Sequence, residues 1–190
     1  MRFPLASPPY DEKVQQAMDK VDLGPLAPQN FLRVLAHQPR LMGNVVALGG
    51  SLMYKGSLPE RLREIAIFRV ASRTRCDYEW AMHRALFADK CSIDEGQLQA
   101  LHSGPCDAPC WSLPEQLIIA AVDELHEGST ITPATWQRMS GQWSPAELLE
   151  IVILVGHYTL VAYFMNATGA PPEEGARHLA VFHPDQGAGQ

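Results

Sequence analysis

The stretch PERLREIAI, residues 59–67, recurs in altered form as PAELLEIVI, residues 145–153. The two stretches lie 86 residues apart, and proline, leucine, glutamate and two isoleucines coincide between them. Each stretch has the signals of a helix start, with proline in the first turn, an acidic residue close behind it, and then apolar residues at helical spacing. The repeat predicts two related helical halves that pack around a shared core.

The remainder of the chain also reads as helix, and no convincing alternating strand is found. We therefore predict an all-α fold in a single domain spanning residues 1–190, with an extended arm over residues 1–10 and a loose tail over residues 175–190. Residues 39–54 and a long segment that ends near Thr168 are predicted helices. A break is expected over residues 72–75, where Thr74 is predicted to cap the following helix.

The composition is that of a globular protein with a sizeable core, since 46% of the 190 residues are hydrophobic and 19% are charged. The net charge is −6 and no Lys/Arg cluster is visible, which argues against nucleic acid or an anionic membrane as partner. We expect no apolar run as long as the roughly 18 residues of a membrane span, and no secretory signal is visible. The expected compartment is the cytoplasm. Cys106 and Cys110 are predicted to be reduced thiols.

A polar stripe on one predicted helix attracts attention. Cys76, Glu79 and His83 share one face of that helix with Trp80. Near the start of a helix a cysteine is favoured as thiolate, and an i, i+4 carboxylate can hold an imidazole in one tautomer. Apolar walls would move the pKa values of the carboxyl and imidazole groups toward neutrality. Glu64, on the preceding antiparallel helix, is expected to approach His83.

The spacing of these residues resembles a known family. Glu64, eleven residues, Cys76, two residues, position 79, three residues and His83 match the pattern of the alkylhydroperoxidase D-like (AhpD-like) group in the carboxymuconolactone decarboxylase superfamily. The resemblance implies an AhpD-like helical bundle that assembles as a homo-oligomer, a trimer or hexamer, with sites near subunit contacts. Glu79 stands where redox members carry a second cysteine, so the residue pattern resembles that of the decarboxylase-like branch. Without that second cysteine, a dithiol peroxidase cycle is not supported.

This resemblance implies a cofactor-free lyase, a decarboxylase acting on a small carboxylated lactone or a related enolisable acid. His83 would donate the proton, Glu79 would orient His83, Glu64 would act through a water or as a second acid, and Cys76 would line the pocket or donate a weak hydrogen bond. The predicted substrate pocket contains Tyr78, Trp80 and His157, although His157 also fits a satisfied core histidine. Arg69, Arg73 or Arg75 is a candidate for binding a substrate carboxylate, although a solvated role is the default for each.

Other functions stay open on the sequence. One is a thiol-dependent alkylhydroperoxidase-like antioxidant enzyme that uses Cys76 and an external thiol. Another is a non-catalytic oligomeric member that binds a small molecule, with the polar stripe as an inactive hydrogen-bond network. A zinc ion held by Cys76, Glu79, His83 and Glu64 is possible by ligand type, but family precedent argues against it, so no metal and no cofactor are predicted.

Overall fold

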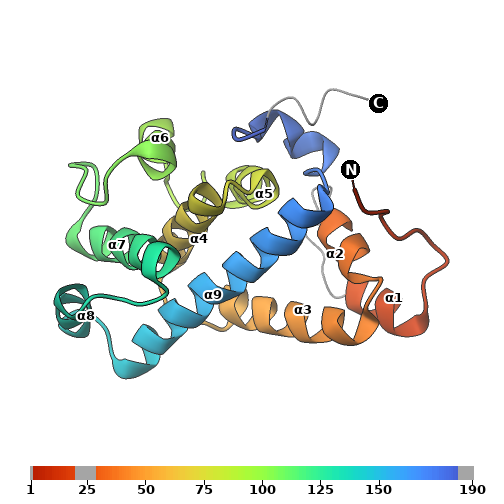
Figure 1. Ribbon diagram of the computed structural model, residues 1–190, viewed down its shortest axis with the longest axis horizontal. Helices are drawn as coiled ribbons and strands as arrows, with labels where there is room; N and C mark the ends of the chain where they lie inside the picture. Colours follow the sequence, from red (N-terminus) through yellow and green to blue (C-terminus); the bar gives the residue numbers. More distant parts are fainter. Residues whose placement is uncertain (1, 20–28, 184–190) are drawn as a thin grey trace.

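The computed structural model describes residues 2–19 and 29–183, and within these ranges it contains helices and no strand. Residues 2–10, predicted as an extended arm, contain no helix. The prediction of an all-α fold is confirmed (Figure 1). The helices are α1 (Glu12–Met18), α2 (Gln29–Leu35), α3 (Pro39–Tyr54), α4 (Glu60–Thr74), α5 (Asp77–Phe87), α6 (Glu95–Ser103), α7 (Leu113–Gly128), α8 (Pro133–Ser140), α9 (Pro145–Thr168) and the 3₁₀ helix η2 (Glu174–Leu179).

Helix α4 is the centre of the fold. It packs against α5, α6, α7 and α9, and every residue from 63 to 72 is buried. A helix that is buried on all sides is normally apolar all round, yet this one carries Arg63, Glu64 and Arg69. These three side chains need partners inside the protein, because an unpaired charge in the interior is costly.

The two repeated stretches form the starts of α4 and α9, which pack against each other. Ser144 caps α9 and forms a capping box with Glu147, and Pro145 occupies the first turn. In Figure 1, α9 runs diagonally across the molecule, with α4 against its middle. The repeat thus places its two copies side by side at the core.

The turn between α4 and α5 differs from the prediction. Helix α4 continues through Thr74, whose hydroxyl donates to the carbonyl of Val70 at 2.7 Å instead of capping the next helix. Arg75 then adopts a left-handed conformation (φ 52°, ψ 44°), and Cys76 is the N-cap of α5. The predicted break falls at Arg75, inside residues 72–75, but the capping role predicted for Thr74 was wrong, because its hydroxyl bonds back within α4 and Cys76 takes the N-cap position.

The C-terminal segment is also more ordered than expected. The backbone N–H groups of Val181 and Phe182 both donate to Asp77 Oδ1 at 2.8 Å. Asp77 lies in the first turn of α5, where its charge is favourable. The segment is therefore held as far as residue 183, unlike the loose tail predicted over residues 175–190. Residues 184–190 of that prediction lie outside the described part of the chain.

Helix α9 corrects the expectation that no segment is long and apolar enough to cross a membrane. By length and composition it qualifies, with a mean hydropathy of 1.8 over its most apolar 18 residues. Half of that window is buried inside the protein. The core helix of a soluble protein passes the same test, so the observation is weak evidence for a membrane.

Candidate functional site

Glu64 and His83 meet in the interior between α4 and α5. The two helices are joined by only two residues, and the resulting hairpin sets the side chains opposite each other. His83 Nδ1 lies 2.7 Å from Glu64 Oε2. The other imidazole nitrogen, Nε2, lies 3.4 Å from Glu79 Oε2. His83 is thus held between two carboxylates, and the short contact that orients it comes from Glu64, not from Glu79 as predicted.

Arg63 extends this cluster. Its Nε donates to Glu64 Oε1 at 3.0 Å, and its Nη1 donates to the carbonyl of Met53 at 2.9 Å. The cluster therefore alternates in sign, from the Arg63 guanidinium through Glu64 and His83 to Glu79. With His83 protonated the four groups sum to zero net charge, which is the arrangement that a buried set of charges needs.

The electrostatics favour a protonated histidine. Burial lowers the pKa of His83, but the charge and hydrogen bond of Glu64, aided by Glu79, outweigh it and raise the pKa from 6.5 to about 9. His83 is therefore an imidazolium at neutral pH. The pKa of His83 was predicted to move toward neutrality. It rises beyond that because the effect of two carboxylates on the imidazolium exceeds the effect of burial among apolar side chains.

Aromatic rings enclose the imidazole. The ring centroids of Phe87 and Tyr158 each lie 5.3 Å from that of His83, and that of Phe68 lies at 6.5 Å. Glu64 is 0% exposed, whereas His83 and Glu79 keep 7% and 5% of their surface exposed. Arg63 at the opposite end is 5% exposed, so Glu64 is the fully buried centre of the cluster and its ends reach the surface.

Cys76 does not have the character expected of a reactive thiol. It is fully buried in the cluster that includes Met82, Val161 and Ala162. Burial and the charge of Glu79 raise its pKa well above the usual value, although backbone N–H groups of α5 act in the opposite direction. The predicted thiolate at a helix start is therefore disfavoured, because desolvation is stronger than the helix-end effect.

The three predicted pocket residues are all buried but are not gathered together. The Tyr78 hydroxyl accepts from the N–H of Phe31 and donates to Glu173, both at 3.2 Å, so it ties α5 to α2 and the C-terminal segment. Trp80 packs edge-on against Phe68 and Phe182. Both side chains have structural surroundings.

His157 Nδ1 is buried and has no hydrogen-bond partner among the described residues, and the same holds for Trp80 Nε1. Burial lowers the pKa of His157, while the charge of Glu79 acts against that shift. His157 is thus a neutral imidazole within electrostatic reach of the His83 cluster, and its unpartnered Nδ1 does not match the hydrogen-bonded core histidine that was the alternative prediction.

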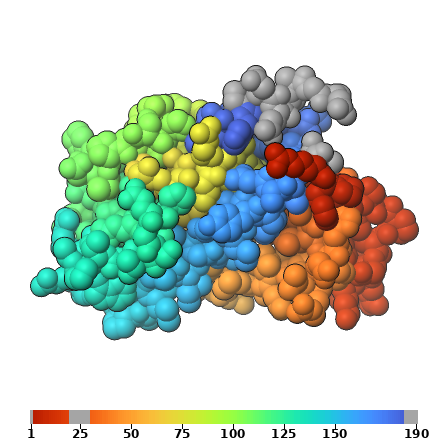
Figure 2. All heavy atoms as spheres, viewed as in Figure 1, coloured from red at the N-terminus to blue at the C-terminus, as the bar shows by residue number. Residues whose placement is uncertain are grey.

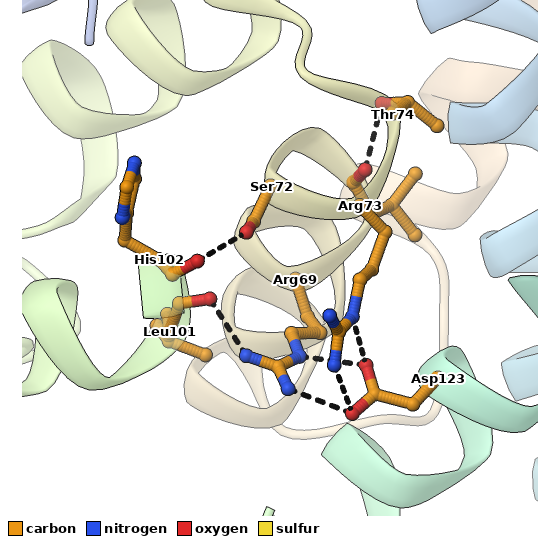
Figure 3. Close-up of polar contacts among 8 residues, drawn as sticks. Arg69, Ser72, Arg73, Thr74, Leu101, His102 and Asp123 are labelled. Carbon is orange, nitrogen blue, oxygen red and sulfur yellow. Dashed lines mark hydrogen bonds and ion pairs between the residues drawn. The ribbon is translucent and has the colours of Figure 1, made fainter. Parts of the chain in front are cut away.

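The predicted carboxylate-binding arginines are engaged elsewhere. Arg69 and Arg73, on consecutive turns of α4, both grip Asp123 of α7 through two hydrogen bonds each, at 2.6 to 2.7 Å (Figure 3). Arg69 also donates to the carbonyl of Leu101 at 2.9 Å. Arg69 is 1% exposed, so the solvated role expected for it was wrong. Arg75 is exposed.

Arg63 is the residue that sequence reasoning missed. The available signal was an arginine placed directly before Glu64, between Leu62 and Ile65. An arginine in that position is indistinguishable by pattern from a solvated one. Its role becomes visible only when the Met53 carbonyl is seen beside it.

No metal site is formed in the described part of the chain. There, no three His, Cys, Asp or Glu side chains are grouped so as to hold a metal ion. The four residues considered as zinc ligands are therefore not gathered into such a set. A groove of about 460 Å³ lies between α8 and the start of α9, and none of the predicted site residues lines it.

A buried carboxylate–imidazole pair lies at the centre of this all-helical fold. Residues 39–103, about a third of the chain, match the model of the carboxymuconolactone decarboxylase family. This region contains Glu64, Cys76, Glu79 and His83, so the match falls on the residues whose spacing carries the resemblance. The expected AhpD-like fold is confirmed by the solved structures that follow. Comparison with curated proteins gives no match.

Solved structures share the fold at low sequence identity. The "alkylhydroperoxidase AhpD core: uncharacterized peroxidase-related protein" of Ralstonia eutropha JMP134 is 17% identical, with a TM-score of 0.79 over 92% of this chain and 93% of that one. An uncharacterized peroxidase-related protein of Silicibacter sp. TM1040 is 19% identical, with a TM-score of 0.77 over 93% and 92%. The debrominase Bmp8, in a variant bound to 2,3,4-tribromopyrrole, is 13% identical, with a TM-score of 0.70 over 88% of both chains.

Proposed function

We propose that this protein is a cofactor-free acid–base lyase that decarboxylates a small carboxylated lactone or a related enolisable acid, with His83 as the general acid. The observation that carries the proposal is the placement of the His83 ring between two carboxylates, with Glu64 at 2.7 Å from Nδ1 and Glu79 at 3.4 Å from Nε2. General acid catalysis by a positioned imidazole is a common source of rate enhancement.

The two ring nitrogens of His83 have different roles in this proposal. The Nδ1–H bond is committed to Glu64, whereas the Nε2–H has only the longer contact and is the proton available to a substrate. When the bond to the carboxyl group breaks, its electron pair remains on the substrate carbon, conjugated into the lactone carbonyl, and carbon dioxide leaves. Nε2 then delivers its proton to that carbon, and the neutral imidazole keeps its Nδ1–H on Glu64. Solvent at the Glu79 end returns the proton.

The proposal departs from thiol chemistry because the Cys76 thiol is fully buried and its pKa is raised. A thiol peroxidase needs an accessible thiolate. The peroxidase-related neighbours share only the fold at these identities. Cys76 serves as a packing residue beside the acid–base cluster.

The test is turnover of a carboxylated unsaturated lactone in D₂O, followed by NMR for deuterium at the carbon that loses the carboxyl group. His83→Gln should lower the rate by about 10²-fold or more, whereas Cys76→Ser should retain it within a few-fold. His126→Gln, which changes an exposed histidine of α7, is the matched control. Reduction of an alkyl hydroperoxide by an external thiol that is lost in Cys76→Ser and kept in His83→Gln would overturn the proposal. If neither the wild type nor any variant turned over the lactone or the hydroperoxide, a binding protein would be favoured instead.

A further inference from the structure

His157 of α9 has a buried ring nitrogen that the fold leaves unused. Its Nδ1 atom makes no hydrogen bond within the described part of the chain, and the residue is 6% exposed. A buried polar atom without a hydrogen bond costs free energy. An apolar side chain at this position would avoid that cost, so the stability of the fold does not account for a histidine here.

Gly49 of α3 makes room for the His157 ring. A Cβ atom built on Gly49 would lie 3.0 Å from His157 Nε2 and 3.5 Å from its Cε1, so the imidazole occupies the space that a side chain would need. Glycine is unfavourable inside a helix. At Gly50, the next residue, a Cβ atom would meet nothing within 4 Å. Figure 2 shows the orange atoms of α3 beside the blue atoms of α9, and the two helices pack against each other.

The His157 ring lies beside the acid–base cluster. The Tyr158 ring contacts both imidazoles, with its centroid 5.4 Å from that of His157 and 5.3 Å from that of His83. Glu79 is the charged group whose field acts on the pKa of His157, and it is also the group 3.4 Å from His83 Nε2. His157 is therefore close to the end of the cluster at which the proposed proton donor meets its substrate.

Some other buried ring nitrogens also lack a partner, and their surroundings differ. Trp80 Nε1 and His102 Nδ1 are among them. Both rings pack against Phe182, at 5.6 and 5.2 Å between centroids, so the C-terminal segment covers them. His157 instead combines its unpartnered nitrogen with a glycine that makes room for the ring and with the nearby charge of Glu79.

We propose that the Nδ1–H of His157 donates a hydrogen bond to the carbonyl oxygen of the substrate, on which negative charge develops as carbon dioxide leaves. This inference rests on the proposed lyase function and assigns a second residue to that site. The electron pair of the broken bond spreads from the carbon onto this oxygen. His157 keeps its proton, and His83 Nε2 delivers its own proton to the carbon.

A neutral imidazole suits this role. Burial lowers the pKa of His157, so the ring can offer an N–H group without carrying a charge, and a neutral imidazole N–H can polarise a carbonyl group. A donor that is already in place where charge develops needs no reorganisation during the reaction, which makes it an effective source of rate enhancement.

Paired variants at positions 157 and 49 test this role. His157→Leu removes both ring nitrogens, whereas His157→Asn keeps an amide N–H near the position of Nδ1. With a carboxylated unsaturated lactone, His157→Leu should lower kcat by about 10²-fold and change KM less, and His157→Asn should recover at least tenfold of that loss. Gly49→Ala, whose methyl group would press on the ring, should lower kcat by about tenfold. Gly50→Ala is the matched control and should leave kcat unchanged.

Binding of the tetronate anion, a five-membered lactone that carries an enolate oxygen, gives a readout that needs no turnover. Tetronate should shift the imidazole NMR signal of His157, and His157→Leu should bind it at least tenfold more weakly than the wild type. Because His157→Leu removes an unpartnered polar atom, its melting temperature should be no lower than that of the wild type.

The outcomes separate this inference from the proposed function. A His157→Leu protein with the kcat of the wild type, in an enzyme that His83→Gln inactivates, would overturn the role of His157 and leave the lyase standing. Tetronate binding that depends on His157, without turnover of any lactone, would overturn the lyase and support oxyanion binding by His157. An unshifted His157 signal would mean that Nδ1 bonds only a buried water, and equal losses of kcat and of melting temperature in His157→Leu and His157→Asn would mean a purely structural histidine. Either result would overturn the inference.

Discussion

Glu64→Gln is the sharpest perturbation of the buried cluster, because it removes one charge while leaving the side-chain shape. In the wild type the pKa of His83 is raised from 6.5 to about 9. At about 1.4 kcal/mol for each factor of ten in proton affinity, this corresponds to roughly 3 kcal/mol of stability from the protonated form. Without the charge and hydrogen bond of Glu64, only Glu79 opposes the lowering effect of burial, so the pKa of His83 should fall toward its ordinary value of 6.5 and the histidine should be largely neutral at pH 7.5.

The direction of the pH dependence follows from the raised pKa. Because folding raises the proton affinity of His83, its stabilising effect is complete below pH 6.5 and is lost as pH rises through about 9. The wild type should therefore lose roughly 3 kcal/mol between these limits, which is a fall in Tm of about 6–12 °C for a chain of this size. In Glu64→Gln this slope should be absent, so the difference between the two proteins isolates His83 from other titrating groups.

Thermal melts from pH 6 to pH 9.5 measure the slope, and NMR titration of the imidazole Cε1–H signal measures the pKa directly. The His83→Gln protein assigns the signal and serves as a second variant if Glu64→Gln folds poorly, since it too should lack the slope. A wild-type His83 that titrates near 6.5, or one whose pKa is unchanged by Glu64→Gln, would refute the electrostatic reasoning.

Three further outcomes are expected. Asp123→Asn should destabilise the protein by about 3–5 kcal/mol in urea unfolding, because it leaves the buried Arg69 without its counter-ion. In the native protein Cys110 should react with a thiol reagent such as DTNB, and Cys76 should react only after unfolding, since the first is exposed and the second is buried. Asp77→Ala should release the C-terminal segment and increase cleavage after residue 177 in limited trypsin digestion, because the Asp77 carboxylate accepts from the backbone N–H groups of that segment.

Each of these outcomes has a control. Glu95→Gln breaks the surface ion pair with Arg84, in which the Glu95 side chain is 77% exposed, and should change stability by less than about 1 kcal/mol. A similar loss in both variants would contradict the burial argument for Asp123. Modification of Cys76 at the same rate as Cys110 would show that its environment opens readily. An Asp77→Ala protein as resistant to trypsin as the wild type would mean that other contacts hold the segment.

The sequence was sufficient for the helices and for one side-chain contact. Helix α3 occupies the predicted residues 39–54, and the approach of Glu64 to His83 follows from two antiparallel neighbours joined by a short turn. Spacing along a helix and the reversal between helices are local properties, so a pattern can reveal them. The role of Glu79 was harder to predict from the sequence, because two carboxylates within reach of one imidazole differ only in their distance from it.

Properties that depend on burial could not be read from the chain. The pKa of Cys76 was expected to fall at a helix start, but desolvation by residues from α9 and other segments raises it. Arg69 was expected in solvent, but α6 and α7 close over it. The partners of Arg69 lie 32 and 54 residues away in sequence, and Cys76 is buried by Val34, Val161 and Ala162 as well as by its neighbours in α5, so no local pattern reports either environment.

The repeated stretches show why only one half of the fold has the acid–base cluster. Glu64 and Glu150 hold the same position in the repeat. Glu150 accepts hydrogen bonds from the N–H and hydroxyl of Ser57, at 2.9 and 2.6 Å, and from the N–H of Leu58 at 3.2 Å. It therefore fixes the loop from which α4 starts. Helix α4 is followed by a tight turn that brings α5 and His83 back against Glu64, whereas α9 ends at Gly169 and leads into η2. A glutamate at one repeat position thus anchors the start of α4 from α9, and its counterpart within α4 is left to orient the histidine.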